Sequence, residues 1–100
     1  MLKITSGAAE LLSAARASSG APEQFGVRFH VIETPAEGKS LAVDFVESPE
    51  PQDEVAEEEG LSVFVAREVA PVLADSTLDA EKQDGRNRLV LREGSGGVRH

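Results

Sequence analysis

Apolar residues recur at helical spacing near the start of the chain. Thr5-Ser6 offers a side-chain oxygen that can accept from the first backbone N–H groups of a helix, and Gly20 suits the left-handed conformation at a helix end. The apolar stripe between them consists of Ala8, Leu11, Leu12 and Ala15. This spacing predicts a helix over residues 6–18. Apolar and polar residues alternate over residues 2–4, which predicts a short strand before it.

After Pro22 the period changes from helical to strand-like. Two alternating segments are separated by a turn-forming stretch over residues 34–38. The apolar members of the first segment are Val27, Phe29 and Val31, and those of the second are Leu41, Val43 and Phe45. Two alternating segments joined by a short connection predict an antiparallel β-hairpin.

Short apolar runs in the second half predict further strands and a second helix. Residues 66–73 are compatible with a short helix, in which Pro71 fits only near the first turn. The predicted strands cover residues 52–57, 61–65, 77–80 and 88–92, the last two joined by polar residues 82–85. We therefore expect an α+β domain built on a curled, mostly antiparallel, barrel-like β-sheet, with one N-terminal helix and one short second helix.

The length of 100 residues accommodates one small domain. Hydrophobic residues make up 40% of the chain and charged residues 28%, which is typical of a folded protein. We expect a single domain over residues 1–93 and a flexible Gly/Ser-rich tail over residues 94–100. No apolar run approaches the roughly 20 residues that span a bilayer, and the chain does not open on a secretory pattern, so a cytoplasmic protein is expected.

The formal net charge of −8 narrows the range of partners. Eighteen acidic side chains outnumber ten Lys and Arg, and no basic stripe with interleaved aromatic residues is present. Nucleic acid is therefore not an expected ligand, and an anionic membrane surface is disfavoured.

Cysteine is absent from the chain. A disulfide framework, a thiolate nucleophile and a cysteine-ligated zinc or iron–sulfur site are thereby excluded. Any metal would have to be held by carboxylates or by His30 and His100.

Several short segments of the sequence, in order and with little gapping, are similar to segments of one protein family. They are Met1-Leu2-Lys3-Ile4-Thr5, Gly26-Val27-Arg28-Phe29, Leu61-Ser62-Val63-Phe64-Val65-Ala66, Ala70-Pro71-Val72-Leu73 and Ser76-Thr77-Leu78-Asp79. Together they resemble the A-type iron–sulfur carrier (HesB/IscA-like) family. The resemblance implies the HesB-like fold, a partner in the iron–sulfur assembly machinery and a possible homodimer, because family members form dimers and tetramers that hold the cluster between subunits.

The chain departs from this family at every cluster ligand. The first family cysteine falls at Ala36, followed by Glu37-Gly38 in place of Ser-Gly. The C-terminal Cys-Gly-Cys is missing, with Arg99 where its first cysteine would be. Arg86-Asn87-Arg88 replaces the Gly-Ser-Gly turn that usually precedes the last strand. No residue is therefore assigned as a cluster ligand, and no cofactor is expected.

Three other groups of polar residues are candidates for a site. Residues 47–59 hold seven carboxylates, which could bind a hard cation but are better explained as a solvated loop. His30 lies opposite the apolar members of its strand, so a structural role is favoured. The basic residues Lys82, Arg86, Arg88 and Arg92 could dock a carboxylate-rich partner, although acidic residues lie among them.

The favoured hypothesis is a non-enzymatic relative of the A-type carriers that acts through protein–protein contacts. The alternative is an iron or divalent-cation binder that uses carboxylate and His ligands, such as Glu37, His30 or the acidic run. A small hydrolytic or isomerising enzyme ranks last, because no catalytic arrangement is recognisable.

Overall fold

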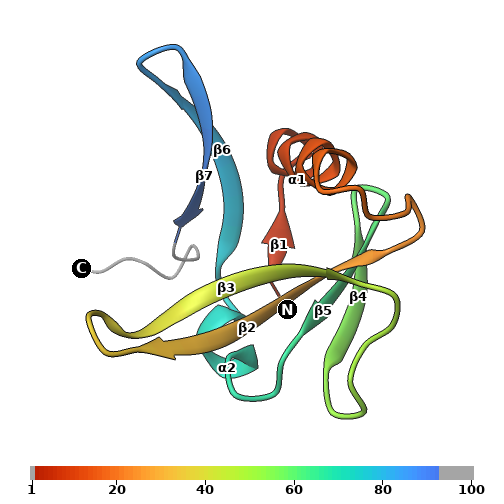
Figure 1. Cartoon of the computed structure of the whole chain (residues 1–100), viewed down its shortest axis with the longest axis vertical. Helices are drawn as coiled ribbons and strands as arrows, with labels where there is room; N and C mark the ends of the chain where they lie inside the picture. The colour runs from red at the N-terminus through yellow and green to blue at the C-terminus, as the bar shows by residue number, and fades with distance from the viewer. Residues whose placement is uncertain (1, 93–100) are drawn as a thin grey trace.

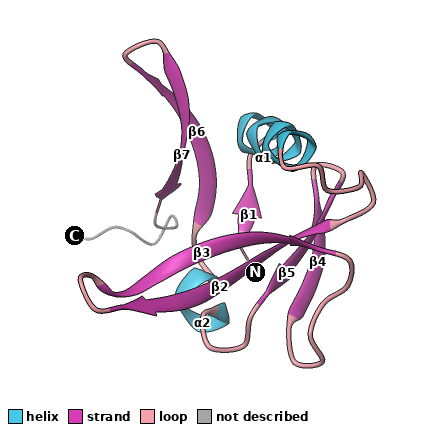
Figure 2. Cartoon of the chain, in the orientation of Figure 1, coloured by secondary structure: helices cyan, strands magenta, loops and turns pink. Residues whose placement is uncertain are grey.

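The computed structural model describes residues 2–92 of the chain. Two helices, α1 and α2, and seven strands make up this part of the chain (Figure 1). The helices are α1 (Ser6–Ser18) and α2 (Ala70–Leu73); the strands are β1 (Lys3–Ile4), β2 (Gly26–Thr34), β3 (Gly38–Val46), β4 (Glu54–Glu58), β5 (Leu61–Val65), β6 (Thr77–Gln83) and β7 (Arg86–Arg92). The expected α+β class is confirmed, and strands dominate the described part of the chain (Figure 2).

The strands form two sheets, and these do not close into a barrel. One sheet has the order β1-β6-β7 and the other the order β3-β2-β5-β4. The structure therefore corrects the expectation of a single barrel-like sheet. The division arises because β6 pairs with β1 in parallel, whereas β5 pairs with β2 in parallel, and the β6–β7 hairpin extends away from the four-stranded sheet (Figure 1). Antiparallel pairs still form the majority.

Helix α1 begins and ends as its sequence predicts. Thr5 is the N-cap, and its Oγ1 accepts a hydrogen bond from the backbone N–H of Ala8 at 3.2 Å. Gly20 has φ +84°, the left-handed conformation that a glycine adopts without strain. Ala8 and Leu12 are buried against the sheets. The apolar stripe thus holds α1 on the core.

The β2–β3 hairpin is confirmed, with cross-strand partners from Gly26–Val46 to Thr34–Gly38. Directly opposed residues of an antiparallel pair share a face, so Phe29 and Val43 lie on the inner face of the sheet. Phe29 is fully buried. His30 therefore lies on the outer face, as its position opposite the apolar residues predicts.

Helix α2 is shorter than predicted. The backbone N–H of Ala66 donates to the carbonyl of Phe29 at 2.9 Å, so this residue continues the pairing between strands rather than starting a helix. A turn over Ala66–Val69 follows, and α2 begins at Ala70. Pro71 occupies the first turn of α2, where a missing N–H costs nothing.

The β6–β7 hairpin is longer than predicted. Polar residues 82–83 belong to β6, and only Asp84-Gly85 remains as the turn. Both turn residues have positive φ, 53° and 78°, as a two-residue type I′ hairpin turn requires. The expected domain end at residue 93 and the tail over 94–100 lie outside the described residues.

Candidate functional site

The turn between β2 and β3 contains Ala36, the position at which the sequence resemblance predicts the family's first cysteine. The Oγ1 of Thr34 accepts from the N–H of Glu37 at 3.1 Å, and the Ser40 hydroxyl donates to Glu37 Oε1 at 3.4 Å. Gly38 closes the turn with φ +70°. Ala36 is exposed and offers only a methyl group. The hydrogen bonds of the turn do not involve Ala36, whose side chain cannot bind a metal; Arg99 lies outside the described residues.

The residues considered for carboxylate or histidine ligation do not converge. His30 Nε2 lies 2.7 Å from Asp44 Oδ2 on the outer face of the hairpin, whereas Glu37 lies at its turn. Among residues 2–92, no group of three or more His, Asp or Glu side chains is placed to hold a metal ion. His100 lies outside this range.

Asp53 does not match the expectation of a solvated acidic run. Its side chain is only 2% exposed and accepts from Arg28 Nε at 2.8 Å and Nη2 at 3.0 Å. The N–H of Glu50 also donates to it at 2.9 Å. The Arg28 hydrogen bond lowers the pKa of Asp53, against the opposing effect of burial, and raises the pKa of Arg28. No local pattern indicates this pair, because 25 positions separate its members.

The expected solvated loop is only partly a loop, because residues 54–58 form strand β4, but most of the other carboxylates in the run are exposed. Glu47, Glu50, Glu54, Glu57 and Glu59 are exposed. Glu58 is half-buried, and its Oε1 accepts from the backbone N–H of Ile4 at 3.3 Å. This contact joins β4 to the short strand β1, so Glu58 has a structural role.

Two basic residues of the β6–β7 hairpin, Arg88 and Arg92, pair with its acidic residues. Arg92 Nε lies 3.1 Å from Asp79 Oδ2, and both Arg88 and Arg92 lie 3.4 Å from carboxylate oxygens of Glu81. The N–H of Ala80, then the Thr5 hydroxyl and Arg92, lower the pKa of Asp79. These contacts support ordinary polar positions on a hairpin for Arg88 and Arg92.

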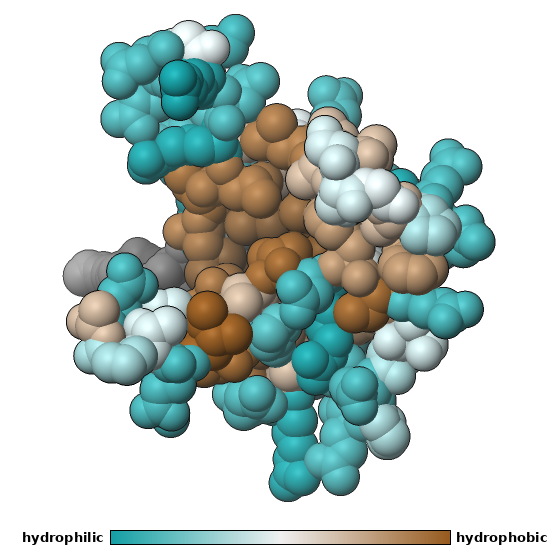
Figure 3. Space-filling model, in the orientation of Figure 1, coloured by the Kyte–Doolittle hydropathy of each residue, from teal (hydrophilic) through white to brown (hydrophobic). Residues whose placement is uncertain are grey.

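An apolar groove lies between the two hairpins and α2. Its cavity measures about 410 Å³. Its apolar lining consists of Val31, Leu41, Val69, Val72, Leu73 and Leu91, and Lys39, Ser40 and Glu68 supply the polar part. Leu41 is 40% exposed, Val72 72% and Leu91 44%. Figure 3 shows hydrophobic surface gathered on the face below the hydrophilic tip of the β6–β7 hairpin. The groove therefore offers contact area for an apolar partner surface.

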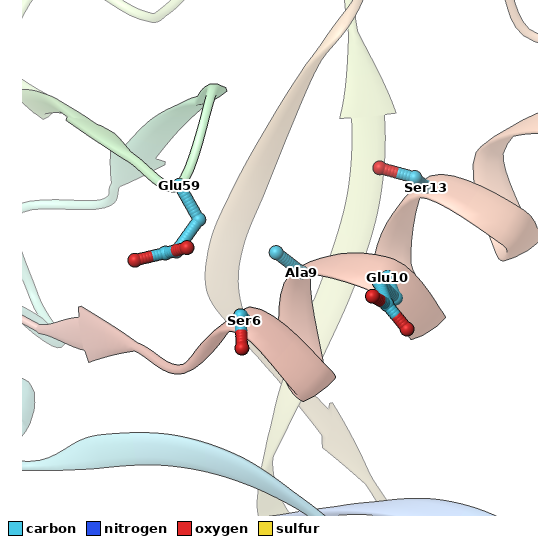
Figure 4. A pocket seen from close by; sticks show the side chains of 5 residues that line it. All are labelled: Ser6, Ala9, Glu10, Ser13 and Glu59. Carbon is cyan, nitrogen blue, oxygen red and sulfur yellow. The ribbon is translucent and has the colours of Figure 1, made fainter.

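A second hollow, of about 360 Å³, lies between α1 and the β4–β5 turn. Ser6, Glu10 and Ser13 project from α1, and Glu59 lies on the turn across from them (Figure 4). The polar side chains that line this hollow are two carboxylates and two hydroxyls, which by themselves form neither a catalytic arrangement nor a metal site. The apolar groove is thus the better candidate.

Across residues 2–92, no helix is long and apolar enough to cross a membrane.

Comparison with known proteins finds likeness in structure rather than in sequence. No protein-family model and no curated protein sequence matches the chain. A crystal structure of IscA with a 2Fe-2S cluster is similar, with a TM-score of 0.78 and 17% identity over 93% of this chain and 85% of that one.

Two further solved structures are similar. One is Escherichia coli SufA, a protein involved in iron–sulfur cluster biosynthesis, with a TM-score of 0.70 and 22% identity over 92% of this chain and 84% of that chain. The other is a protein from Aquifex aeolicus solved by NMR in solution, with a TM-score of 0.68 and 22% identity over 92% of this chain and 90% of that chain. The resemblance in the sequence is confirmed at the level of structure: this cysteine-free chain has the fold of the A-type iron–sulfur carriers.

Proposed function

We propose that the chain is a non-enzymatic interaction module that serves iron–sulfur cluster assembly through protein–protein contacts. It does so without holding a cluster through thiolates, because the chain contains no cysteine. The observation that supports this role is the apolar groove between the hairpins and α2. The similarity of the whole chain in fold to IscA and SufA points to the assembly machinery as the source of the partner.

The groove exposes apolar side chains from three separate elements. Leu41 comes from β3, Val72 from α2 and Leu91 from β7. Burial of apolar surface contributes about 25 cal/mol per Å², so covering side chains that converge in this way stabilises a complex. Exposed apolar residues that are scattered singly need no explanation, but a cluster of them marks an interaction site.

The experiment compares a groove variant with a matched surface variant. The double variant Leu41→Ser/Val72→Ser removes two exposed groove residues, and Val55→Ser removes an apolar residue that is 60% exposed on β4, away from the groove. Each tagged protein is used to capture proteins from an extract of its own cell, and iron in the eluate is measured in parallel.

The wild-type protein and Val55→Ser are expected to co-elute with a cysteine desulfurase, a scaffold or an iron–sulfur client protein. The groove variant is expected to lose that partner while keeping its circular dichroism spectrum. Equal capture by all three proteins would contradict the role of the groove. Stoichiometric iron in the eluate without such partners would instead support carboxylate and histidine ligation.

A further inference from the structure

Strand β7 has a free edge in the described part of the chain. The sheet order β1-β6-β7 places its seven residues at the end of a sheet, paired with β6 alone. Every second residue of an edge strand directs its N–H and C=O groups away from the sheet, where they can pair with another extended chain. The backbone of β7 therefore offers a template for an added strand.

The two faces of β7 differ in chemistry. Leu91 lies opposite the buried Leu78, and Leu89 lies opposite Ala80, so both leucines share the face that turns toward the core. They nevertheless remain 44% and 36% exposed, and Leu91 lines the apolar groove. An added strand would therefore place alternate side chains beside these leucines and over the groove.

The opposite face of β7 carries positive charge. Arg86, Arg88 and Arg92 project from this face, and β7 contains no acidic residue, although the whole chain has a net charge of −8. Arg88 and Arg92 are paired with acidic residues of β6, but their side chains are 56% and 51% exposed. Such exposed pairs are weak and can be shared with a new carboxylate. Within residues 2–92, Arg86 has no ion-pair partner.

We propose that β7 binds an extended segment of a partner protein in which aliphatic and acidic residues alternate. This inference rests on the proposed interaction role and adds the binding mode and the chemistry of the partner. Backbone hydrogen bonds to the edge of β7 provide affinity, as in other cases of strand addition. Aliphatic side chains of the partner cover Leu89, Leu91 and the groove, and its carboxylates meet Arg86 and Arg88.

The test uses the whole chain and a short synthetic peptide in which valine and glutamate alternate. In one control peptide, lysine replaces glutamate. In the other, the valines and the glutamates stand in two separate blocks. Binding is followed by fluorescence anisotropy at low and high ionic strength. The alternating acidic peptide is expected to bind at least about tenfold more tightly than either control, and this preference should shrink at high salt because the charges are exposed.

Two charge variants sharpen the test. Arg86→Glu removes a cation that makes no ion pair in the described structure, so the folding of this variant is not at risk. Arg86→Glu/Arg88→Glu removes two cations of β7. The single variant is expected to weaken binding of the acidic peptide several-fold, and the double variant to favour the lysine peptide. Val55→Ser, on β4, should bind as the wild-type protein does. Unchanged peptide preference in both charge variants would overturn the proposal.

Amide hydrogen exchange separates strand addition from binding in the groove alone. If a strand is added, alternate amides of Arg86–Arg92 gain protection in the complex. Binding without that protection overturns strand addition, and so does failure of the acidic peptide to bind. Dimerisation of the chain with slowed exchange in β7 would show that a second copy occupies the edge, which also overturns the proposal. These results are independent of the capture experiment with Leu41→Ser/Val72→Ser, so the proposed interaction role can fail or stand separately.

Discussion

Strands β5 and β7 both carry several apolar residues, yet their surroundings make them serve different purposes. β5 lies between β2 and β4, and its Val63 and Val65 are 0% and 1% exposed. β7 lies at a sheet edge, and its Leu89 and Leu91 remain partly exposed. Aliphatic side chains therefore stabilise the fold at β5 and remain available for contact at β7. The position of a strand in its sheet, central or at the edge, decides which of these two roles its aliphatic side chains have.

We expect the largest effect on the free energy of unfolding from a substitution in β5. Val63→Asp places a carboxylate among buried apolar side chains, where its charge loses the solvation that water provides. We expect a loss of about 4 kcal/mol or more, which is comparable with the whole stability of many small domains. Urea denaturation followed by circular dichroism measures this loss. A stable, cooperatively unfolding Val63→Asp protein would show that β5 is less essential than its burial indicates.

The Arg28–Asp53 pair should have an intermediate effect on stability. It joins β2 to the segment that precedes β4, so it fastens the edge of the four-stranded sheet. Asp53→Asn leaves Arg28 without its charged partner, and we expect a loss of about 1–3 kcal/mol. Glu57→Gln is a suitable control, because Glu57 is exposed and should change stability little. Equal unfolding midpoints for the two variants would argue against this role of the pair.

The same pair predicts how stability depends on pH. The pKa of Asp53 is lower in the folded protein than its ordinary value of 3.8. Its contribution is therefore fully present above about pH 4 and is lost as the pH falls through the lowered pKa. Unfolding free energies measured between neutral and acidic pH should decline in this window, and less steeply in Asp53→Asn. Parallel declines in both proteins would show that other carboxylates control acid unfolding.

The smallest effect on stability is expected from the corresponding change made in β7. Leu91→Asp replaces a side chain that is already 44% exposed, so we expect a loss below about 1 kcal/mol. Binding of the alternating acidic peptide should nevertheless fall strongly, because the new carboxylate lies in the groove. Comparison of the urea midpoint with peptide affinity separates the two properties. A loss as large as that of Val63→Asp would remove the distinction between β5 and β7.

Local patterns predicted most elements of this fold correctly. The capped apolar stripe indicated α1, and the two alternating runs around residues 34–38 indicated the β2–β3 hairpin. Ala66 and the residues after it are equally compatible with a helix, but a hydrogen bond to Phe29, 37 positions earlier in the chain, decides otherwise. Alternation assigns residues to faces, yet it does not tell which strands pair. The parallel pairs and the division into two sheets were therefore not predicted.

The sequence did not predict the apolar groove. The absence of cysteine is visible in the composition, which alone determines that Ala36 offers no thiolate. The groove, by contrast, is made by residues from three distant parts of the chain, such as Leu41, Val72 and Leu91. Each is an ordinary apolar residue within its own element. Only the tertiary arrangement reveals that they converge on one exposed surface.

The side-chain hydrogen bonds of the β2–β3 turn do not use Ala36. Thr34, Glu37 and Gly38 close the turn by backbone and side-chain geometry, while Ala36 is exposed to solvent and supports nothing. Different residues of this five-residue segment therefore close the turn and face the solvent. A substitution at Ala36 should therefore change the chemistry of the turn with little effect on folding.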